Sequence, residues 1–190
     1  EQQMFQFEVL SYNEQAHHID AVEAALVGTF MDGKQVTFID HRDQQEKTMT
    51  YAEIFMEAAK ITNVSPFFLV QRCLMEVSRQ GSGSVSGTVA GYEGYYNFYN
   101  IGATAGTNPV LNALKYARYG RYASGPTQTE RNNYLLPWDS QWRAIVGGAF
   151  WIGSGYVNAG QDTQYSQKFN LDGDTYGTYW HQYMGNVYAP

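Results

Sequence analysis

Helix start signals, each followed by apolar residues at helical spacing, constrain the fold of this chain more than any other feature. Thr50-Tyr-Ala-Glu53 is a capping box, in which each side chain can bond the backbone amide of the other residue. Ser65-Pro66 and Asn108-Pro109 each combine an N-cap residue with a first-turn proline, and Asp139 or Ser140 precedes another apolar stripe. The sequence therefore predicts a mainly helical domain.

The segments outside these helices are also informative. Glu14–Val27 shows helical spacing, Val36–Ile39 is long enough only for a short extended piece, and Asp162 is placed to cap a short last helix. Residues 81–106 and 120–137 are rich in Gly and Tyr and are predicted to be loops or short hairpins. Binding and catalytic residues are often found on such loops, held by a rigid scaffold.

Composition excludes several classes of protein. The 190 residues carry a net charge of −6 and a sequence pI near 5.1, which argues against a duplex nucleic-acid binder, because such a protein needs Lys and Arg to neutralise phosphates. No run of about 20 apolar residues is present, so no membrane insertion is predicted. Aromatic residues make up 16% of the chain, and most of the Tyr and all the Trp follow residue 91.

The candidate catalytic group is Glu76, in the segment Glu76-Val-Ser-Arg-Gln-Gly-Ser-Gly-Ser-Val-Ser-Gly87. It shares a helix face with Leu69 and Cys73, so we expect it at the edge of the core and close to a flexible Gly/Ser turn. A partly buried carboxylic acid in that position suits a general acid. The alternative is a carboxylate paired with Arg72 or Arg79 on a solvated face.

A second stretch supplies groups that recognise sugars. Gly91-Tyr-Glu-Gly-Tyr-Tyr-Asn-Phe-Tyr-Asn-Ile-Gly-Ala103 is rich in Tyr and Asn, and Glu93 is its only charge. Aromatic faces cover the apolar patches of sugar rings, and amides bond hydroxyl and N-acetyl groups. Glu93 is the candidate for the second carboxylate of a glycosidase pair, and a loop carboxylate at an entrance is the alternative interpretation.

Other reactive groups indicate no metal or cofactor. Cys73 lies in the middle of a helix on its apolar stripe, where a buried structural thiol is expected rather than a nucleophile. His17 and His18 are adjacent on a predicted helix and diverge by about 100°, so they cannot share a ligand. No second His cluster completes a metal site.

The ordered motifs resemble the N-acetylglucosaminidases of glycoside hydrolase family 73. Helix–Glu76–Gly-Ser-Gly-Ser, followed by Tyr-Tyr-Asn97-Phe-Tyr-Asn100-Ile-Gly-Ala, is similar to two elements of that family. Residues 147–158 and 160–169 resemble later segments, with Asp162, Tyr165 and Lys168 in matching places. Ser78 and Thr163 depart from the family pattern without removing an acid–base group.

The resemblance covers roughly residues 48–190 and implies a lysozyme-like, two-lobed helical domain with a small β-hairpin or loop region beside a substrate groove. It implies an endo-β-N-acetylglucosaminidase that cleaves the β-1,4 bond between N-acetylglucosamine and N-acetylmuramic acid in peptidoglycan, with Glu76 as general acid. The second catalytic group is Glu93, a loop acid that moves, or the N-acetyl group of the substrate, and these alternatives stay open. The expected substrate-binding residues are Tyr96, Asn97, Tyr99, Asn100, Tyr165 and Ser84.

Several expectations concern the whole protein. Residues 1–190 are predicted to form one catalytic domain, with residues 1–47 as an N-terminal helical lobe and residues 48–190 as the glycosidase core. We expect a monomer excised from a larger bacterial cell-wall protein, secreted and bound to peptidoglycan glycan strands through wall-binding domains elsewhere. The alternatives are a muramidase or lytic transglycosylase on the same fold, and a catalytically inactive glycan-binding module.

Overall fold

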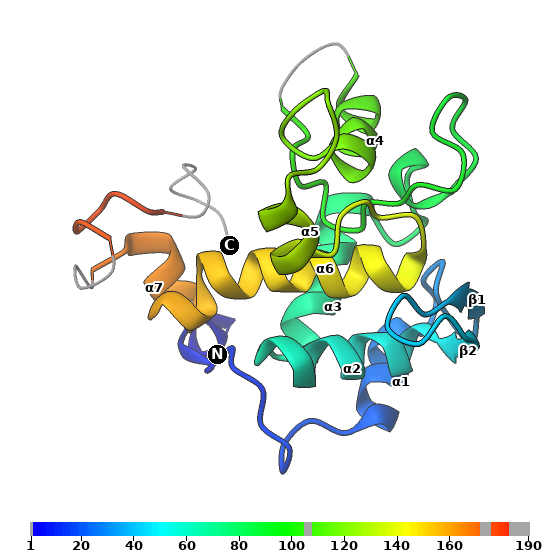
Figure 1. Ribbon diagram of the computed structural model, residues 1–190. Coiled ribbons are helices and arrows are strands. Elements are labelled where there is room, and N and C mark those ends of the chain that lie inside the picture. Colours follow the sequence, from blue (N-terminus) through cyan, green and yellow to red (C-terminus); the bar gives the residue numbers. More distant parts are fainter. Residues whose placement is uncertain (1, 105–107, 172–175, 183–190) are drawn as a thin grey trace.

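The computed structural model describes residues 2–104, 108–171 and 176–182, and helices dominate its architecture (Figure 1). The α-helices are α1 Ile19–Leu26, α2 Tyr51–Thr62, α3 Pro66–Val77, α4 Pro109–Tyr119, α5 Gln128–Tyr134, α6 Gln141–Gly155 and α7 Gln164–Phe169. The strands are β1 Gln35–Ile39 and β2 Glu46–Thr50, and the 3-10 turns are η1 Gln2–Phe7, η2 Gly83–Val85 and η3 Val157–Ala159. The predicted mainly helical class with a small β-hairpin is confirmed.

The predicted helix start signals form as expected. Thr50 Oγ1 accepts a hydrogen bond from the Glu53 amide at 3.1 Å, and a Glu53 carboxylate oxygen accepts one from the Thr50 amide at 2.7 Å. The side chains of Ser65, Asn108 and Ser140 cap α3, α4 and α6 by each accepting one hydrogen bond from the backbone amide three residues further on. Each cap satisfies an amide that the helix itself leaves without a partner, so it sets where the helix begins.

Two helix boundaries differ from prediction, and one helix, α5, forms where the sequence predicts a loop. Helix α1 begins at Ile19 and not at Glu14, because the Asn13 side chain accepts a hydrogen bond from the Gln15 amide and forms a local turn that competes with helix. Helix α5 lies inside the predicted loop 120–137. Helix α7 is capped by Thr163 and not by Asp162.

Helix α6 is the centre of the packing (Figure 1). It crosses the molecule with α2 below it and α4 and α5 above it. Trp142, Ile145 and Ile152 on this helix are fully buried, and each such side chain contributes about 1.5–3 kcal/mol by leaving water. A Cβ at Gly148 would lie 2.3 Å from the ring of Tyr99, so the absent side chain lets the loop before α4 rest directly on the helix.

The β-hairpin joins the N-terminal segment to the rest of the chain. β1 and β2 pair antiparallel with Gln35 opposite Thr50 and Ile39 opposite Glu46. Val36 and Phe38 alternate toward the core, and Phe38 stacks on Trp142 of α6 with ring centroids 5.8 Å apart. The predicted boundary at residue 47 therefore falls inside β2, and the division into a lobe and a core stays a prediction.

A buried carboxylate anchors the turn of this hairpin. The Asp40 side chain has no exposed area, and it accepts hydrogen bonds from the Arg42 guanidinium at 2.6–3.0 Å and from Lys47 Nζ at 2.6 Å. Arg42 also pairs with Glu57 of α2 at 2.9 Å and lies over the Trp142 ring. These bonds hold the pKa of Asp40 well below its usual range, chiefly through Arg42, although burial opposes the shift.

We predict that Asp40→Asn lowers the free energy of unfolding by about 2 kcal/mol near neutral pH, because it removes the buried carboxylate that accepts charged hydrogen bonds from Arg42 and Lys47. The pKa of Asp40 is lower in the native state than in the unfolded state. Its contribution to the free energy of unfolding is therefore present above the unfolded-state pKa of about 4 and is lost as the pH falls below that pKa. Urea unfolding of the native protein and of Asp40→Asn across this pH range should therefore show a difference in the free energy of unfolding that becomes smaller as the pH is lowered.

Asp43→Asn is the matched control for this experiment. Asp43 also pairs with Lys47, at 2.8 Å, but its side chain is 46% exposed. An exposed pair contributes less than about 1 kcal/mol. Equal losses of stability in the two variants would contradict the role given to Asp40.

Candidate active site

Glu76 lies in the last turn of α3, where it is half-buried. The helix buries Leu69, Cys73 and Val77 on the side that faces the core, and it stops at Ser78, whose φ is +64°. No ion pair joins Glu76 to another described residue, and the guanidinium of Arg79 instead donates to the carbonyl of Val27 at 2.7 Å. The alternative interpretation of Glu76, as a carboxylate paired with Arg72 or Arg79, finds no such pair among the ion pairs of the described residues.

The side-chain amide of Asn100 links the end of α3 to the loop that follows the Gly/Ser turn. Its Nδ2 donates to the backbone carbonyl of Glu76 at 2.6 Å, and its Oδ1 accepts from Ser84 Oγ at 3.0 Å. Asn100 itself has a φ of +48°, a conformation that Asn tolerates better than most residues. The backbone of Glu76 and the side chains of Ser84 and Asn100 are thus brought together.

Ser84 is part of the support for this contact. Its side chain has no exposed area, and its Oγ lies 2.7 Å from Ser82 Oγ within the turn η2. The Ser84 carbonyl accepts a hydrogen bond from the Asn97 amide at 2.7 Å. The geometry gives Ser84 a role in holding the loop, whereas the sequence suggested direct substrate contact.

Asn97 is buried in the same loop. Its Nδ2 donates to the carbonyls of Ile101 and Ala113, each at 2.9 Å, and its Oδ1 accepts from the Ile101 amide at 3.1 Å. With no exposed area and both ends of the amide bonded, Asn97 joins the loop to α4. We assign it to positioning Asn100, and we predict no direct contact with substrate.

The tyrosines of this stretch divide by burial. Tyr99 is buried against Gly148, and burial raises the pKa of its phenol well above the ordinary value of 10. Tyr96 is half-buried, with its hydroxyl close to Gly87, where a Cβ would lie only 2.5 Å away. Of the two, only Tyr96 has the exposure that contact with a substrate requires.

Glu93 lies in an exposed turn before these tyrosines. Backbone hydrogen bonds at Glu93 and Gly91 lower the pKa of its carboxyl, and the charge of Arg118 acts in the same direction. Arg118 also donates to the Gly91 carbonyl at 3.0 Å, which ties the turn to α4. A carboxylate that stays ionised can accept a proton but is poorly suited to donate one.

Tyr165 occupies a different part of the structure. It lies in α7, with its ring centroid 4.9 Å from that of Phe7 and 4.8 Å from that of Phe169. The neighbouring residue Gln164 links α7 to α3, because its Nε2 donates to Gln71 Oε1 at 3.0 Å. The substrate-binding role of Tyr165 stays a prediction.

Cys73 behaves as a structural thiol. It has no exposed area, and burial raises the pKa of its thiol far above the ordinary value. A thiol held in the protonated form is a poor nucleophile. Within the described residues, no group of three or more His, Cys, Asp or Glu side chains is placed to hold a metal ion.

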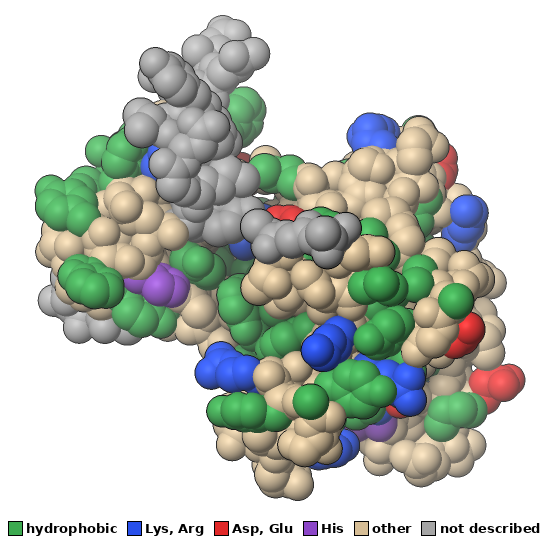
Figure 2. All heavy atoms as spheres, turned by 90° about the horizontal axis from the view of Figure 1, so that it is seen from above, with side chains coloured by type: hydrophobic (Ala, Val, Ile, Leu, Met, Phe, Trp, Pro, Cys, Tyr) green, Lys and Arg blue, Asp and Glu red, His purple; other side chains and the backbone are tan. Residues whose placement is uncertain are grey.

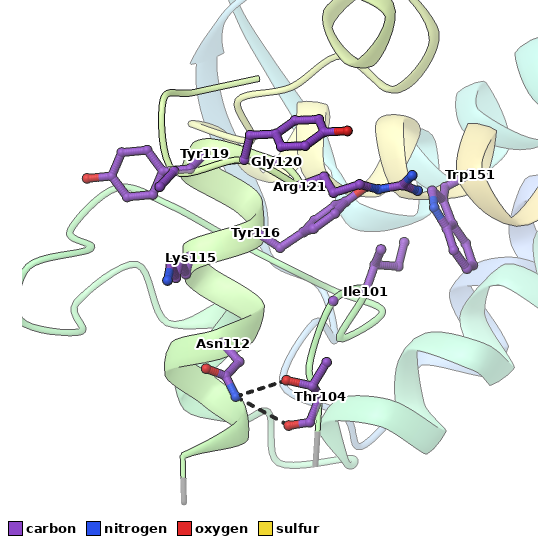
Figure 3. A pocket seen from close by; sticks show the side chains of 12 residues that line it. Ile101, Thr104, Asn112, Lys115, Tyr116, Tyr119, Gly120, Arg121 and Trp151 are labelled. Atoms are coloured by element: carbon purple, nitrogen blue, oxygen red, sulfur yellow. Dashed lines mark hydrogen bonds between the residues drawn. The ribbon is translucent and has the colours of Figure 1, made fainter. Parts of the chain in front are cut away.

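A hollow of about 600 Å³ opens next to the Asn100 loop, between α4 and α6 (Figure 3). Its walls include Ile101, Tyr116, Arg121 and Trp151. Figure 2 shows hydrophobic side chains gathered across the hollowed face of the molecule, with Lys and Arg side chains beside them. Sequence reasoning did not single out Arg121 or Trp151, and the only signal was the aromatic enrichment of the second half.

The fold and the site define a class: a mainly helical domain with a small β-hairpin, in which a carboxylic acid at the end of α3 adjoins the loop of residues 91–103, called here the Tyr/Asn loop. No protein-family model matches the chain. The chain is 28% identical over 123 residues, 61% of its length, to the bifunctional autolysin of Staphylococcus aureus. It spans only 9% of that relative's length.

Solved structures share the fold. The structure of S. aureus autolysin E matches 98% of this chain and 66% of its own chain, with a TM-score of 0.62 and 20% identity. S. aureus glucosaminidase B matches 95% and 59%, with a TM-score of 0.59 and 22% identity. A catalytic Glu-to-Ala mutant of autolysin E in complex with the disaccharide NAG-NAM matches 89% and 60%, with a TM-score of 0.55 and 21% identity.

These likenesses confirm the resemblance that the motifs predicted. The chain is homologous to a segment of the bifunctional autolysin, and it has the fold of the autolysin glucosaminidase structures. None of the helices in the part of the chain that the structure describes is long and apolar enough to cross a membrane.

We predict that Asn100→Asp lowers the free energy of unfolding by about 1–2 kcal/mol, because it keeps the acceptor for Ser84 and removes the donor to the Glu76 carbonyl. Asn100→Gly, which tolerates the positive φ, should lose both hydrogen bonds and at least as much stability. Urea unfolding measures both variants. An Asn100→Asp protein as stable as the native one would show that the amide donor does not hold this loop.

Proposed function

We propose that the chain is a peptidoglycan hydrolase, an endo-β-N-acetylglucosaminidase that cleaves the β-1,4 bond between N-acetylglucosamine and N-acetylmuramic acid. The observation that carries the proposal is the placement of Glu76, which is half-buried at the end of α3 with its backbone carbonyl bonded to Asn100 of the Tyr/Asn loop. The homology to the bifunctional autolysin and the fold of the glucosaminidase structures support it.

In this proposal Glu76 is the general acid. Its carboxyl gives a proton to the glycosidic oxygen as the bond to the anomeric carbon breaks, so that the leaving sugar departs as a neutral alcohol. A water molecule then adds to the anomeric carbon and releases a proton, which restores the acid. Because Asn100 fixes the Glu76 backbone, the carboxyl is presented in a defined position, which is what proximity catalysis requires.

Glu93 is the proposed second carboxylate, with the N-acetyl group of the substrate as the alternative. The lowered pKa of Glu93 keeps it ionised, which suits a base that activates water. If Glu93 has this role, Glu93→Gln should lower kcat by about 100-fold or more. Activity that is unchanged in Glu93→Gln would favour assistance by the N-acetyl group.

We predict that Glu76→Gln abolishes the release of reducing ends from purified peptidoglycan, because the amide cannot donate the proton. The melting temperature should stay within a few degrees of the native value, since Glu76 makes no ion pair with a described residue. Glu53→Gln, on the exposed start of α2, is the control and should cleave normally. Cleavage retained by Glu76→Gln would refute its role.

The products distinguish the proposed reaction from its neighbours. We predict that mass spectrometry after borohydride reduction finds N-acetylglucosamine at the new reducing ends. Reduced N-acetylmuramic acid would indicate a muramidase, and an anhydro sugar would indicate a lytic transglycosylase. Binding of muropeptides with no new reducing ends would indicate an inactive glycan-binding module.

The setting follows from the substrate. Peptidoglycan lies outside the cytoplasmic membrane, so we propose a secreted, wall-associated protein whose partners are glycan strands. We also propose that residues 1–190 act as one monomeric catalytic domain that needs no metal or cofactor, with wall-binding domains elsewhere in a longer chain.

A further inference from the structure

The hollow between α4 and α6 is continuous with the proposed catalytic loop. Ile101, which lines it, directly follows Asn100, the residue that bonds to the Glu76 carbonyl. The opposite wall comes from Trp151 of α6. The wall of the hollow and the backbone of the proposed general acid are therefore linked through two neighbouring residues, Ile101 and Asn100.

The walls of the hollow combine aromatic rings with a cation. Figure 3 shows the Arg121 side chain extended toward the indole of Trp151, with Tyr116 and Ile101 on the remaining sides. Burial raises the pKa of Tyr116 to about 12, so its hydroxyl stays neutral and can donate a hydrogen bond. Lys115 also lines the hollow, from the other side of α4.

Glu130, the acidic residue nearest to Arg121 in the sequence, already accepts several hydrogen bonds. Glu130 is buried, and its carboxylate accepts hydrogen bonds from the Arg121 and Thr127 amides, each at 2.8 Å, and from Thr127 Oγ1 at 2.9 Å. Burial alone would raise the pKa of Glu130, but these hydrogen bonds, together with the nearby charge of Arg121, outweigh it and lower the pKa. Glu130 thus holds the backbone of Arg121, and none of the ion pairs among described residues includes Arg121.

We propose that Arg121 determines substrate specificity by binding a carboxylate carried by the glycan strand, an inference that rests on the proposed function. The sugar backbone of peptidoglycan is neutral, whereas its peptides carry free carboxylates, and removal of a peptide exposes the carboxylate of the lactyl ether. A guanidinium pairs with a carboxylate through two parallel hydrogen bonds. Tyr116 and Trp151 would cover the apolar part of the same substituent.

The test compares Arg121→Gln with native protein on three substrates: glycan strands with intact peptides, strands stripped of peptides by an amidase, and neutral chitooligosaccharides. We expect KM to rise about tenfold on a carboxylate-bearing strand, with kcat within about twofold, because the lost contact is made equally in the ground and transition states. KM for chitooligosaccharides should not change.

The change in KM across the three substrates identifies which group of the strand carries the carboxylate. A rise in KM confined to intact strands assigns the contact to the peptide, and a rise confined to stripped strands assigns it to the lactyl group. Arg131→Gln is the matched control, an exposed arginine on the neighbouring helix α5 that does not line the hollow. No change on any substrate, or the same rise on chitooligosaccharides, would overturn the proposal.

A binding measurement separates this proposal from the proposed function. Titration calorimetry of Glu76→Gln protein with a defined muropeptide and with its methyl esters needs no turnover. Arg121→Gln in that background, and esterification of the ligand, should each raise Kd by about tenfold and should not add to one another. Equal affinity for the acid and the ester would overturn the role of Arg121, whereas native protein that cleaves no strand would overturn only the proposed function.

Discussion

One side-chain amide joins the two parts of the candidate site. Asn100 bonds at once to the carbonyl of Glu76 at the end of α3 and to the hydroxyl of Ser84 in the turn beyond it. A helix end leaves its last carbonyls without partners, so a donor is needed there, and here the donor comes from a loop 24 residues further along the chain. The position of Glu76 relative to the Tyr/Asn loop depends on this contact.

The Tyr/Asn loop can make that contact because α4 and α6 hold it in place. Asn97 bonds it to α4, and Tyr99 rests on Gly148 of α6, where any side chain would block the approach. Two residues that the motifs suggested for substrate contact are therefore internal supports. Such supports hold the residues that face a substrate within the narrow range of positions that catalysis tolerates.

Most of the Asp and Glu residues lie in the first half of the chain, and most of the Tyr and all the Trp lie in the second half. The first half buries one of its acids, Asp40, as the anchor of the hairpin that packs on α6. The second half places Tyr116, Arg121 and Trp151 around a hollow beside the Tyr/Asn loop. A surface rich in aromatic rings and poor in acids suits a sugar chain whose charged groups are carboxylates.

The sequence by itself determined where most helices begin and which residue is the candidate acid. Thr50, Ser65, Asn108 and Ser140 act through hydrogen bonds to amides only a few residues away, so the information needed to place them is local. The same kind of signal is present at Thr127 and Glu130, at the start of α5, although the Gly content of the surrounding segment predicts a loop.

Only the tertiary structure decided which polar residues face outward and which are internal supports. Asn97 and Asn100 lie three residues apart in the same motif, yet one bonds to α4 and the other to α3, because each amide finds its partner on a different helix. Arg121, which follows α4, and Trp151 of α6 likewise line one hollow only in the folded chain, a proximity that no spacing along the sequence encodes.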